Sequence, residues 1–468
     1  MPPRTKPEKG NTVSSSSSSP PPTADEIEKK IDSEVHYEFG GPVSVGILMG
    51  FFPCLMIYIF VCLAHNRGDL IVPGFTHSFE AYTSMLYSCV PTFEAVGVYG
   101  LFVVFEAVLA VTLPGPMVQG LPVPSLKGKR LDYCCNGVAC WYATLGTAAV
   151  LHLSGVFPLT WLIRNFGPLM TVAIGFGLAS TAATYLWTVF FGTPHRMSGN
   201  FVYDLFMGAP LNPRLLGGKL DLKMFSEIRV PWVLLFFITL SCCLERQEQT
   251  GHVGWQLWFL LLAHGLYTNA CMKGEECIPT TWDIFYEKWG FMLIFWNFAG
   301  VPFTYCISSL YCLHNESADQ TPLWVRIGLF ALLLTAYYVW DTSNAQKNFF
   351  RMQQAGTYKA RPFAFPQLPW ALLKDPQFIK TKAGSTLLVS GWFGVARKIN
   401  YTADLVMALC WGLACGVRSF LPFFYFFFFL AVLSHRVWRD QERLAKKYGT
   451  DWVEYCKKVP YIFVPYVV

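Results

Sequence analysis

The chain has 468 residues, of which 53% are hydrophobic, 17% are aromatic and only 14% are charged. So apolar a composition excludes a water-soluble enzyme of two or three domains and is typical of a polytopic membrane protein. The formal net charge of +6 does not indicate nucleic-acid binding, because the basic residues lie in loops beside apolar segments, where membrane topology places them.

Residues 1–36 are polar and contain a run of serines from Ser14 to Ser19, followed by Pro20, Pro21 and Pro22. A segment of this composition cannot bury a hydrophobic core, so it is predicted to be a disordered tail in the cytosol. We expect residues 37–340 to form a transmembrane bundle that binds the substrate and supplies part of the active site. Residues 341–468 are expected to form a C-terminal region with the last two spans and an amphipathic tail.

Apolar segments after the tail predict an all-α fold of about ten transmembrane helices, although several are shorter than the ~20 residues that a spanning helix needs. They cover residues 43–64, 91–113, 139–163, 166–191, 230–244, 253–272, 289–314, 327–340, 405–417 and 419–435. The boundaries of the segment at 289–314 are less sharply defined, because it contains Asn297, Gly300 and Pro302.

The distribution of lysine and arginine predicts the orientation of these spans. If the ten segments cross alternately, 31 of the 36 basic residues fall on one side, and only five, Arg67, Arg164, Arg246, Arg326 and Arg418, fall on the other. Basic residues favour the cytosolic side, so both termini are expected in the cytosol. A glycosylation sequon at Asn315 would then be lumenal, whereas the one at Asn400 would be cytosolic and unmodified, which leaves Asn400 to be explained by another role.

Two basic residues in the sequence NAQKNFFRMQ form a candidate phosphate site. Lys347 and Arg351 are four positions apart and share one face of a helix that continues from the eighth span. Two like charges within one turn repel each other and favour an anion between them, such as a phosphate. The alternative is a basic edge that only ends the span.

The segment 387–404 combines Trp392, Arg397, Asn400 and Tyr401 with several glycines just before a span. Aromatic faces and amide donors together suit a planar heterocycle. The alternative is a belt of aromatic residues at the depth of the lipid headgroups.

The C-terminal segment from His435 predicts an amphipathic helix that ends near Gly449, followed by a short aromatic terminus. Arg436 and Asp440 are spaced as an i, i+4 ion pair, and Tyr448 lies two turns further along the same face. A solvated helix that lies on the lipid surface is the alternative.

Four carboxylates, Glu275, Glu276, Asp283 and Glu287, lie between apolar spans. Such surroundings raise the pKa of a carboxyl group, so these residues are candidate acids at neutral pH. The alternative is that they form structural ion pairs with Lys273 or Lys288.

Several site classes are absent from the sequence. It has no glycine-rich turn after a strand, no P-loop and no HExxH motif, so any nucleotide would bind between membrane helices and cytosolic loops. The fifteen cysteines show no repeated metal-ligand spacing. Cys134, Cys135 and Cys140 form a local cluster, but the sequence has no second pair of cysteines or histidines to complete a zinc site with them. The nine histidines are not grouped for a di-iron centre, and no metal site is predicted.

The motifs NAQKNFFRMQ, GWFGVARKINYTAD and RDQERLAKKYGTDWVEYCKKVPYIFVPYVV, spaced as here, resemble the C-terminal half of the sterol reductase family, which includes C-14, Δ7 and 24(28) enzymes. YEFGGP, HRMSGNFVYDLFMGAPLNPR, LDLKMFSEIRVPW and GFMLIFWNFAGVPFTY extend the resemblance across nearly everything after the tail. The details YTNACMKGEE, TTWDIFYEKWGF and VPYIFVPYVV are most similar to the fungal members that act on the 24(28) bond.

The resemblance implies NADPH-dependent reduction of the 24(28) carbon–carbon double bond of a sterol at the endoplasmic reticulum, as the last step of ergosterol synthesis. The implied partners are sterol, membrane lipid and other sterol-synthesis enzymes. The implied NADPH contacts are Lys347, Arg351, Leu388, Trp392, Asn400, Tyr401, Arg436, Asp440, Leu444 and Tyr448, which gives Asn400 a role.

The family's proton-donor candidates correspond to Tyr267 and Asp440. The C-14 enzymes carry an acidic residue shortly after that tyrosine, where this chain has Asn269 and Ala270, so Glu276 is a further candidate. An unactivated alkene accepts hydride only after an acid has protonated it, and protonation of the exocyclic methylene leaves the cation on the better-stabilised tertiary carbon. The site must therefore keep water away from that cation.

Three alternatives remain open from the sequence. The first is a C-14 or Δ7 sterol reductase, and the second is a sterol-binding membrane protein without catalytic activity. The third is a prenylcysteine-type methyltransferase that uses S-adenosylmethionine, because those proteins have a similar C-terminal helix and aromatic, proline-containing ending. They are much shorter and do not need ten spans.

Overall fold

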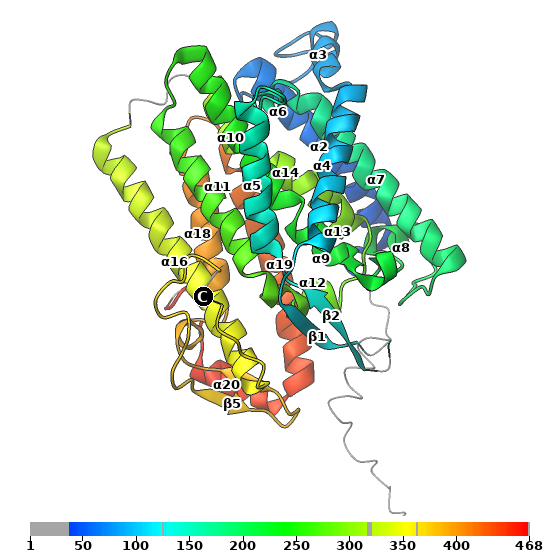
Figure 1. The fold of residues 1–468 in the computed structure, drawn as a ribbon, viewed down its shortest axis with the longest axis vertical. Coiled ribbons are helices and arrows are strands. Elements are labelled where there is room, and N and C mark those ends of the chain that lie inside the picture. Colours follow the sequence, from blue (N-terminus) through cyan, green and yellow to red (C-terminus); the bar gives the residue numbers. More distant parts are fainter. Residues whose placement is uncertain (1–36, 124–125, 127, 316–320, 362–363, 467–468) are drawn as a thin grey trace, which may run out of the picture.

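The computed structural model describes residues 37–123, 126, 128–315, 321–361 and 364–466, so the predicted disordered tail lies outside the described residues. Long helices run side by side through the molecule (Figure 1). One end, called the α3 end below, carries α3 (Phe79–Leu86) and α6 (Trp161–Arg164). The opposite end, called the α20 end, carries β1 (Met117–Val123), β2 (Lys129–Cys134), β5 (Phe378–Lys380) and α20 (Thr450–Lys458).

A helix lies at each of the ten apolar segments predicted from the sequence. Within the described residues, seven helical stretches are long and apolar enough to cross a membrane: α2 (Gly41–Asn66), α4 (Phe93–Thr112), α7 (Phe166–Phe191), α9 with α10 (Leu222–Ile228 and Pro231–Thr250), α13 to α15 (Phe291–His314), α16 (Leu323–Gln354), and α19 (Phe424–Tyr448) with the turn before it. The other three are the shorter apolar helices α5 (Gly137–Leu153) and α18 (Ile399–Ala414), and α11 (Trp255–Lys273). The chain is therefore a multi-pass membrane protein.

Hydrogen bonds between distant loops support the predicted alternation of the crossings. Asn315 Nδ2, after α15, donates to the carbonyl oxygen of Arg67, after α2, over 3.0 Å. Ser419 Oγ, after α18, donates to the carbonyl oxygen of Gly68 over 2.9 Å. These three loops therefore meet at the α3 end, as expected if the helices before them run in the same direction.

The segment between Phe291 and His314 is an interrupted helix. It consists of α13 (Phe291–Phe295), a π-helical turn (Trp296–Gly300), α14 (Val301–Thr304) and α15 (Ile307–His314). Pro302 cannot donate a backbone hydrogen bond, and a Cβ at Gly300 would lie only 2.4 Å from the Trp296 ring. The less sharply defined boundaries predicted for this span therefore have a structural cause.

Helix α16 is long enough to leave the membrane and continue toward the α20 end. Its 32 residues span about 48 Å at 1.5 Å per residue, whereas the hydrocarbon core of a bilayer is about 30 Å thick. Lys347 and Arg351 lie in its last three turns. The prediction that both share one face of a helix continuing from the eighth span is confirmed.

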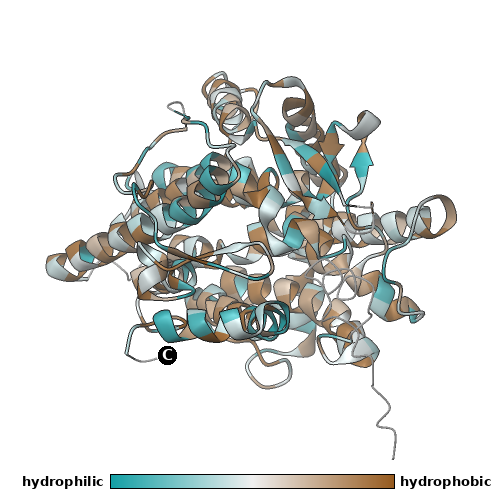
Figure 2. Ribbon diagram, turned by 90° about the horizontal axis from the view of Figure 1, so that it is seen from below, coloured by the Kyte–Doolittle hydropathy of each residue, from teal (hydrophilic) through white to brown (hydrophobic). Residues whose placement is uncertain are grey.

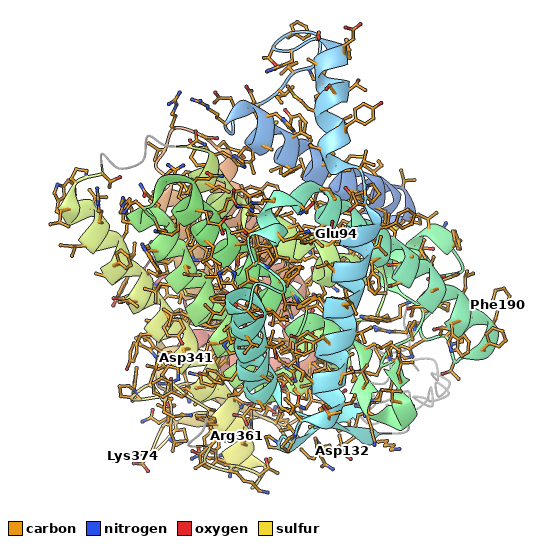
Figure 3. The ribbon with its side chains drawn as sticks, turned by 45° about the horizontal axis from the view of Figure 1, so that its top comes forward. Glu94, Asp132, Phe190, Asp341, Arg361 and Lys374 are labelled. Carbon is orange, nitrogen blue, oxygen red and sulfur yellow. The ribbon has the colours of Figure 1, made fainter. Side chains whose placement is uncertain are left out.

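The outer surface of the bundle carries large apolar side chains. On α7, Trp187, Phe190 and Phe191 are 66%, 71% and 75% exposed, and Phe190 points away from the bundle (Figure 3). Viewed from the α20 end, hydrophobic residues extend along the helices at the edge of the bundle, and hydrophilic segments lie among the helix ends and loops (Figure 2). Lipid contact explains why such side chains remain outside the core.

The elements that complete the α20 end are short: α8 (Phe201–Met207), β3 (Arg214–Leu215), β4 (Leu220–Asp221), α12 (Trp282–Phe285), β6 (Thr386–Leu388) and α17 (Trp392–Val395). In the part of the chain that the structure describes, six strands pair into three antiparallel two-stranded sheets, so the fold remains essentially helical. Helix α19 ends before Gly449, as predicted, but α20 follows where a short aromatic terminus was expected. The predicted boundary at residue 340 falls inside α16, and the division into regions stays a prediction.

Candidate functional site

A cavity of about 2260 Å³ opens at the α20 end of the bundle. Its walls come from the ends of α16, α18 and α19, from the β1–β2 hairpin, and from the segments around residues 276–285 and 384–398. The hairpin's Asp132 and Arg361, from the loop after α16, both lie at this end of the molecule (Figure 3). The cavity lies beside the membrane-spanning part of the protein, because it is built on the ends of spanning helices.

Most of the residues predicted to bind the cofactor line this cavity. They are Lys347, Arg351, Leu388, Asn400, Tyr401, Arg436, Asp440, Leu444 and Tyr448. The predicted contact Trp392 is not in the cavity wall. Its indole Nε1 donates to Thr342 Oγ1 over 2.8 Å, and its backbone N–H donates to Gln346 Oε1 over 2.9 Å, so it packs against α16.

The cavity wall is strongly basic. It contains eleven basic side chains, from Arg130, Lys347, Arg351, Lys359, Arg361, Arg397, Lys398, Arg436, Arg439, Arg443 and Lys447. Against these stand four carboxylates, from Glu276, Asp283, Asp404 and Asp440. This excess favours a ligand with several negative charges, such as a phosphorylated dinucleotide.

Polar and aromatic groups in the wall suit the uncharged parts of such a ligand. Asn400 Nδ2 donates to Asn344 Oδ1 over 3.1 Å, while the buried Asn400 Oδ1 has no hydrogen-bond partner in the described part of the chain. Tyr448 accepts a hydrogen bond from Ser385 Oγ over 3.1 Å. An unsatisfied buried amide oxygen next to aromatic side chains such as Tyr401 fits a donor on a planar heterocycle.

The i, i+4 ion pair predicted between Arg436 and Asp440 is not formed. Arg436 Nη2 lies 2.7 Å from Asp283 Oδ2, and Asp440 pairs with Lys398. Both residues are drawn toward segments that pack against α19 from elsewhere in the chain. The spacing along α19 allowed the pair, but closer tertiary partners replace it.

Ion pairs also hold the other carboxylates of the segment 275–287. Arginines supply the partners: Glu275 pairs with Arg229 at 2.6 Å, Glu276 with Arg361 at 2.5 Å, and Glu287 with Arg439 at 2.9 Å. The alternative of structural ion pairs therefore holds for these three carboxylates, but with arginines in place of Lys273 or Lys288. Lys273 pairs with Asp341 at 2.6 Å, and Lys288 Nζ donates to the carbonyl oxygen of Arg196 over 2.9 Å.

Burial raises the pKa of Glu276, although the neighbouring Arg361 acts in the opposite direction. Burial likewise raises the pKa of Glu275, against the effect of Arg229. The expectation of raised pKa values in this segment is confirmed for these two residues. Glu276 lines the cavity, so this candidate acid faces the space in which a ligand would bind.

Tyr267, another candidate proton donor, is buried on α11 and is not part of the cavity wall. Its hydroxyl donates to Asp404 Oδ2 over 3.3 Å, and Asp404 does line the cavity. Asp404 is the last residue of the motif GWFGVARKINYTAD but was not predicted to be a site residue. Its position one helical turn after Asn400 on α18 is the signal that places it on the same face.

Within the described residues, no group of three or more histidine, cysteine, aspartate or glutamate side chains is arranged to hold a metal ion. The fold and the cavity together define a multi-pass membrane protein with a cationic ligand-binding cavity at one end. The chain belongs to the ergosterol biosynthesis ERG4/ERG24 family, whose model matches residues 33–468.

Two fungal relatives are named Delta(24(24(1)))-sterol reductase. The Aspergillus fumigatus protein, erg4A, is 46% identical over 440 residues, which are 93% of each chain. The Gibberella zeae protein is 41% identical over 94% of this chain and 74% of its own length. A Delta(14)-sterol reductase of Dictyostelium discoideum is 35% identical over 92% and 91% of the two chains. The family model matches residues 33–468, whereas the methyltransferase alternative rested on the C-terminal segment alone.

Proposed function

We propose that this protein reduces the 24(28) carbon–carbon double bond of a sterol side chain with NADPH, as the last step of ergosterol synthesis. The observation that carries the proposal is the basic cavity on the ends of membrane-spanning helices, in a chain 46% identical to a named Delta(24(24(1)))-sterol reductase. A sterol reaches such a cavity from the bilayer and a charged dinucleotide reaches it from water, so a cavity at the membrane edge suits both.

The side chains of the cavity fit the parts of NADPH. Lys347 and Arg351 would bind its 2′-phosphate, and the aromatic and amide groups near Asn400 and Tyr401 would bind a planar ring. When bound, NADPH supplies the hydride. The chain's own residues have three tasks: to orient the two reactants, to deliver a proton to the alkene, and to keep water from the resulting cation.

Tyr267, Asp440 and Glu276 are the residues predicted from the sequence to take part in proton delivery. Single substitutions, Tyr267→Phe, Asp440→Asn and Glu276→Gln, test this set when turnover and NADPH affinity are both measured. Loss of turnover with unchanged NADPH affinity identifies a residue that is needed for proton delivery. Loss of both identifies a residue that holds the cofactor.

Sterol profiling of a cell that lacks this protein tests the substrate. We expect a sterol that retains the 24(28) methylene to accumulate, and the re-introduced gene to remove it. Accumulation of a Δ14 sterol instead would indicate a C-14 sterol reductase, the activity for which the Dictyostelium relative is named. Accumulation of a Δ7 sterol would indicate a Δ7 sterol reductase. Full complementation by the double variant Lys347→Ala, Arg351→Ala would favour a sterol-binding protein without catalytic activity.

The proposed location is the endoplasmic reticulum membrane, with the cavity and both termini in the cytosol. The basic residues concentrated at the α20 end support this orientation. Glycosylation sequons introduced singly next to Phe75, at the α3 end, and next to Lys374, at the α20 end, test it. Only the first should be modified, and modification of the second alone would reverse the orientation.

A further inference from the structure

Three helices meet beside the inner part of the cavity. Tyr267 comes from α11, Trp340 from α16 and Asp404 from α18. The Tyr267 ring stacks on Trp340, with centroids 4.6 Å apart and planes inclined by 21°, and its hydroxyl donates to Asp404 Oδ2 over 3.3 Å. Trp232 packs on Tyr267 as well, with a centroid separation of 4.8 Å. The Asp404 carboxyl group is therefore held at a fixed place next to a cluster of aromatic rings.

Asp404 differs from the three other carboxylates in the cavity wall. Asp283, Asp440 and Glu276 each form an ion pair with a lysine or arginine. Asp404 has no such basic partner within the described residues, although the residue is only 7% exposed. Its hydrogen-bonding neighbours are the Tyr267 hydroxyl and the Trp340 indole. The titratable groups that face it are Tyr267 and Cys271 from α11, Tyr305 between α14 and α15, and Tyr425 from α19.

A neighbouring cation stabilises the ionised form of a carboxyl group and so makes the group a weaker proton donor. A buried carboxyl group without a counter-charge is favoured in its neutral, protonated form instead. Protonation of an unactivated alkene needs a neutral acid that touches the substrate. Among the four carboxylates of the cavity, only Asp404 combines a place in the wall with the absence of a basic partner in the described part of the chain.

We propose that Asp404 is the catalytic acid that protonates the sterol alkene and that Tyr267 is its positioning residue. The inference rests on the proposed function and replaces the three earlier donor candidates with a residue that the sequence did not single out. The hydroxyl of Tyr267 holds Oδ2, and the small exposed part of Asp404 lies in the cavity wall.

In the proposed step, Asp404 gives its proton to the alkene. The O–H bond of Asp404 breaks, the alkene π pair forms a C–H bond at the exocyclic methylene carbon, and the neighbouring tertiary carbon becomes a cation. The cation would accept the hydride that NADPH supplies when bound, and Asp404, left as a carboxylate, would regain a proton from solvent after the product leaves. The ring of Trp340, which lines the cavity, lies where cation–π attraction would stabilise the cationic carbon.

Infrared difference spectroscopy of the purified wild-type protein and Asp404→Asn tests the protonation state without turnover. We expect the wild type at neutral pH to show the C=O stretch of a protonated carboxyl group that shifts in D₂O and is lost in Asp404→Asn. The matched control is Asp341→Asn, which removes a buried but lysine-paired carboxylate from α16 and should keep the band. Absence of the band from the wild type would overturn the proposal.

Kinetics test the role of the same group. Asp404→Asn should lower kcat roughly 10²–10⁴-fold, the usual contribution of a general acid, with the NADPH dissociation constant changed less than twofold. Asp404→Glu should restore part of kcat, which a purely structural role does not predict. A kcat within tenfold of wild type for Asp404→Asn contradicts the proposal.

Tyr267→Phe keeps the inference testable if Asp404→Asn does not fold. Loss of the hydroxyl removes a hydrogen bond to the ionised carboxylate, so the fall of kcat at alkaline pH should move to higher pH. If the pH dependence of kcat is unchanged in Tyr267→Phe, Asp404 is not the catalytic acid. A wild-type protein that shows the infrared band but no NADPH-dependent sterol reduction would instead refute the proposed function, so the two failures are distinguishable.

Discussion

Arg436 and Asp283 are 153 positions apart in the sequence, and the guanidinium Nη2 of the first lies 2.7 Å from the carboxylate Oδ2 of the second. The pair joins α19 to α12 at the wall of the cavity, and both residues face the cavity. Arg439, one turn further along α19, joins the same region by pairing with Glu287 and also with Glu38, just before α2. Folding therefore brings three distant segments together to position the basic side chains of the site.

We predict that Asp283→Asn destabilises the protein by about 1–3 kcal/mol, because it leaves a partly buried guanidinium without its counter-charge. Saturating NADPH should narrow the difference in Tm, since a bound phosphate supplies a new negative charge near Arg436. Thermal unfolding in detergent, with and without NADPH, measures both effects. Glu454→Gln, which breaks an exposed i, i+4 pair with Lys458, is the matched control and should leave Tm unchanged. An equal loss of Tm in the two variants would contradict the prediction.

Arg351→Ala should raise the KM for NADPH by about 10–100-fold, because a charge-assisted hydrogen bond to phosphate contributes about 1.5–3 kcal/mol. The KM for NADH should change far less, because NADH lacks the 2′-phosphate. Steady-state kinetics with both cofactors measure the ratio of the two effects. Lys359→Ala, which removes another basic side chain of the cavity wall, is the comparison. An equal rise in KM for NADPH and NADH would contradict the proposed contact between Arg351 and the 2′-phosphate.

Lys288 gives a prediction about stability and pH. Burial lowers its pKa from 10.5 to about 8. Between these two values the unfolded chain binds a proton at Lys288 that the folded protein does not, so the free energy of unfolding should rise with pH across this window. Each unit of pKa difference is worth about 1.4 kcal/mol.

The measurement compares wild type with Lys288→Met from pH 7 to pH 11. Any loss of packing in the variant is independent of pH and cancels from the slope. The stability of the wild type relative to the variant should therefore increase between about pH 8 and pH 10.5. Parallel curves for the two proteins would show that the pKa of Lys288 is unshifted.

Reduction in D₂O tests which carbon of the double bond receives the proton. If a side chain of the protein protonates the exocyclic methylene carbon, one deuterium should appear in the methyl group that this carbon becomes, because acidic side chains exchange with solvent. Mass spectrometry and NMR of the product sterol locate the label. Deuterium at the tertiary carbon instead would mean that the proton is delivered to the other end of the double bond.

Local patterns in the sequence were enough to predict much of the site. The four-residue spacing of Lys347 and Arg351 placed both on one face of α16, and the apolar segment before them set the helix that carries them toward the cavity. The end of α19 before Gly449 follows from local composition in the same way. Such features depend on the period of a single helix, which neighbouring residues determine.

The pairing of charges was not predictable in this way. Arg436 and Asp440 satisfy the local rule for an ion pair, yet Asp283 and Lys398 are their partners. Trp392 shares a motif with Asn400 and Tyr401, yet it packs against α16 outside the cavity wall. In each case the outcome depends on which distant segment packs against the helix, and the geometry of one helix does not contain that information.

The sequence by itself determined that this chain is a multi-pass helical membrane protein, because apolar composition and helical period are properties of consecutive residues. It also indicated the family and the cofactor contacts, nine of which line the cavity. Only the tertiary structure decided that Asp404 lies beside Tyr267 and has no basic partner among the described residues. The physical reason is that the electrostatic state of a buried acid depends on every group packed around it, and these groups come from helices far apart in the chain.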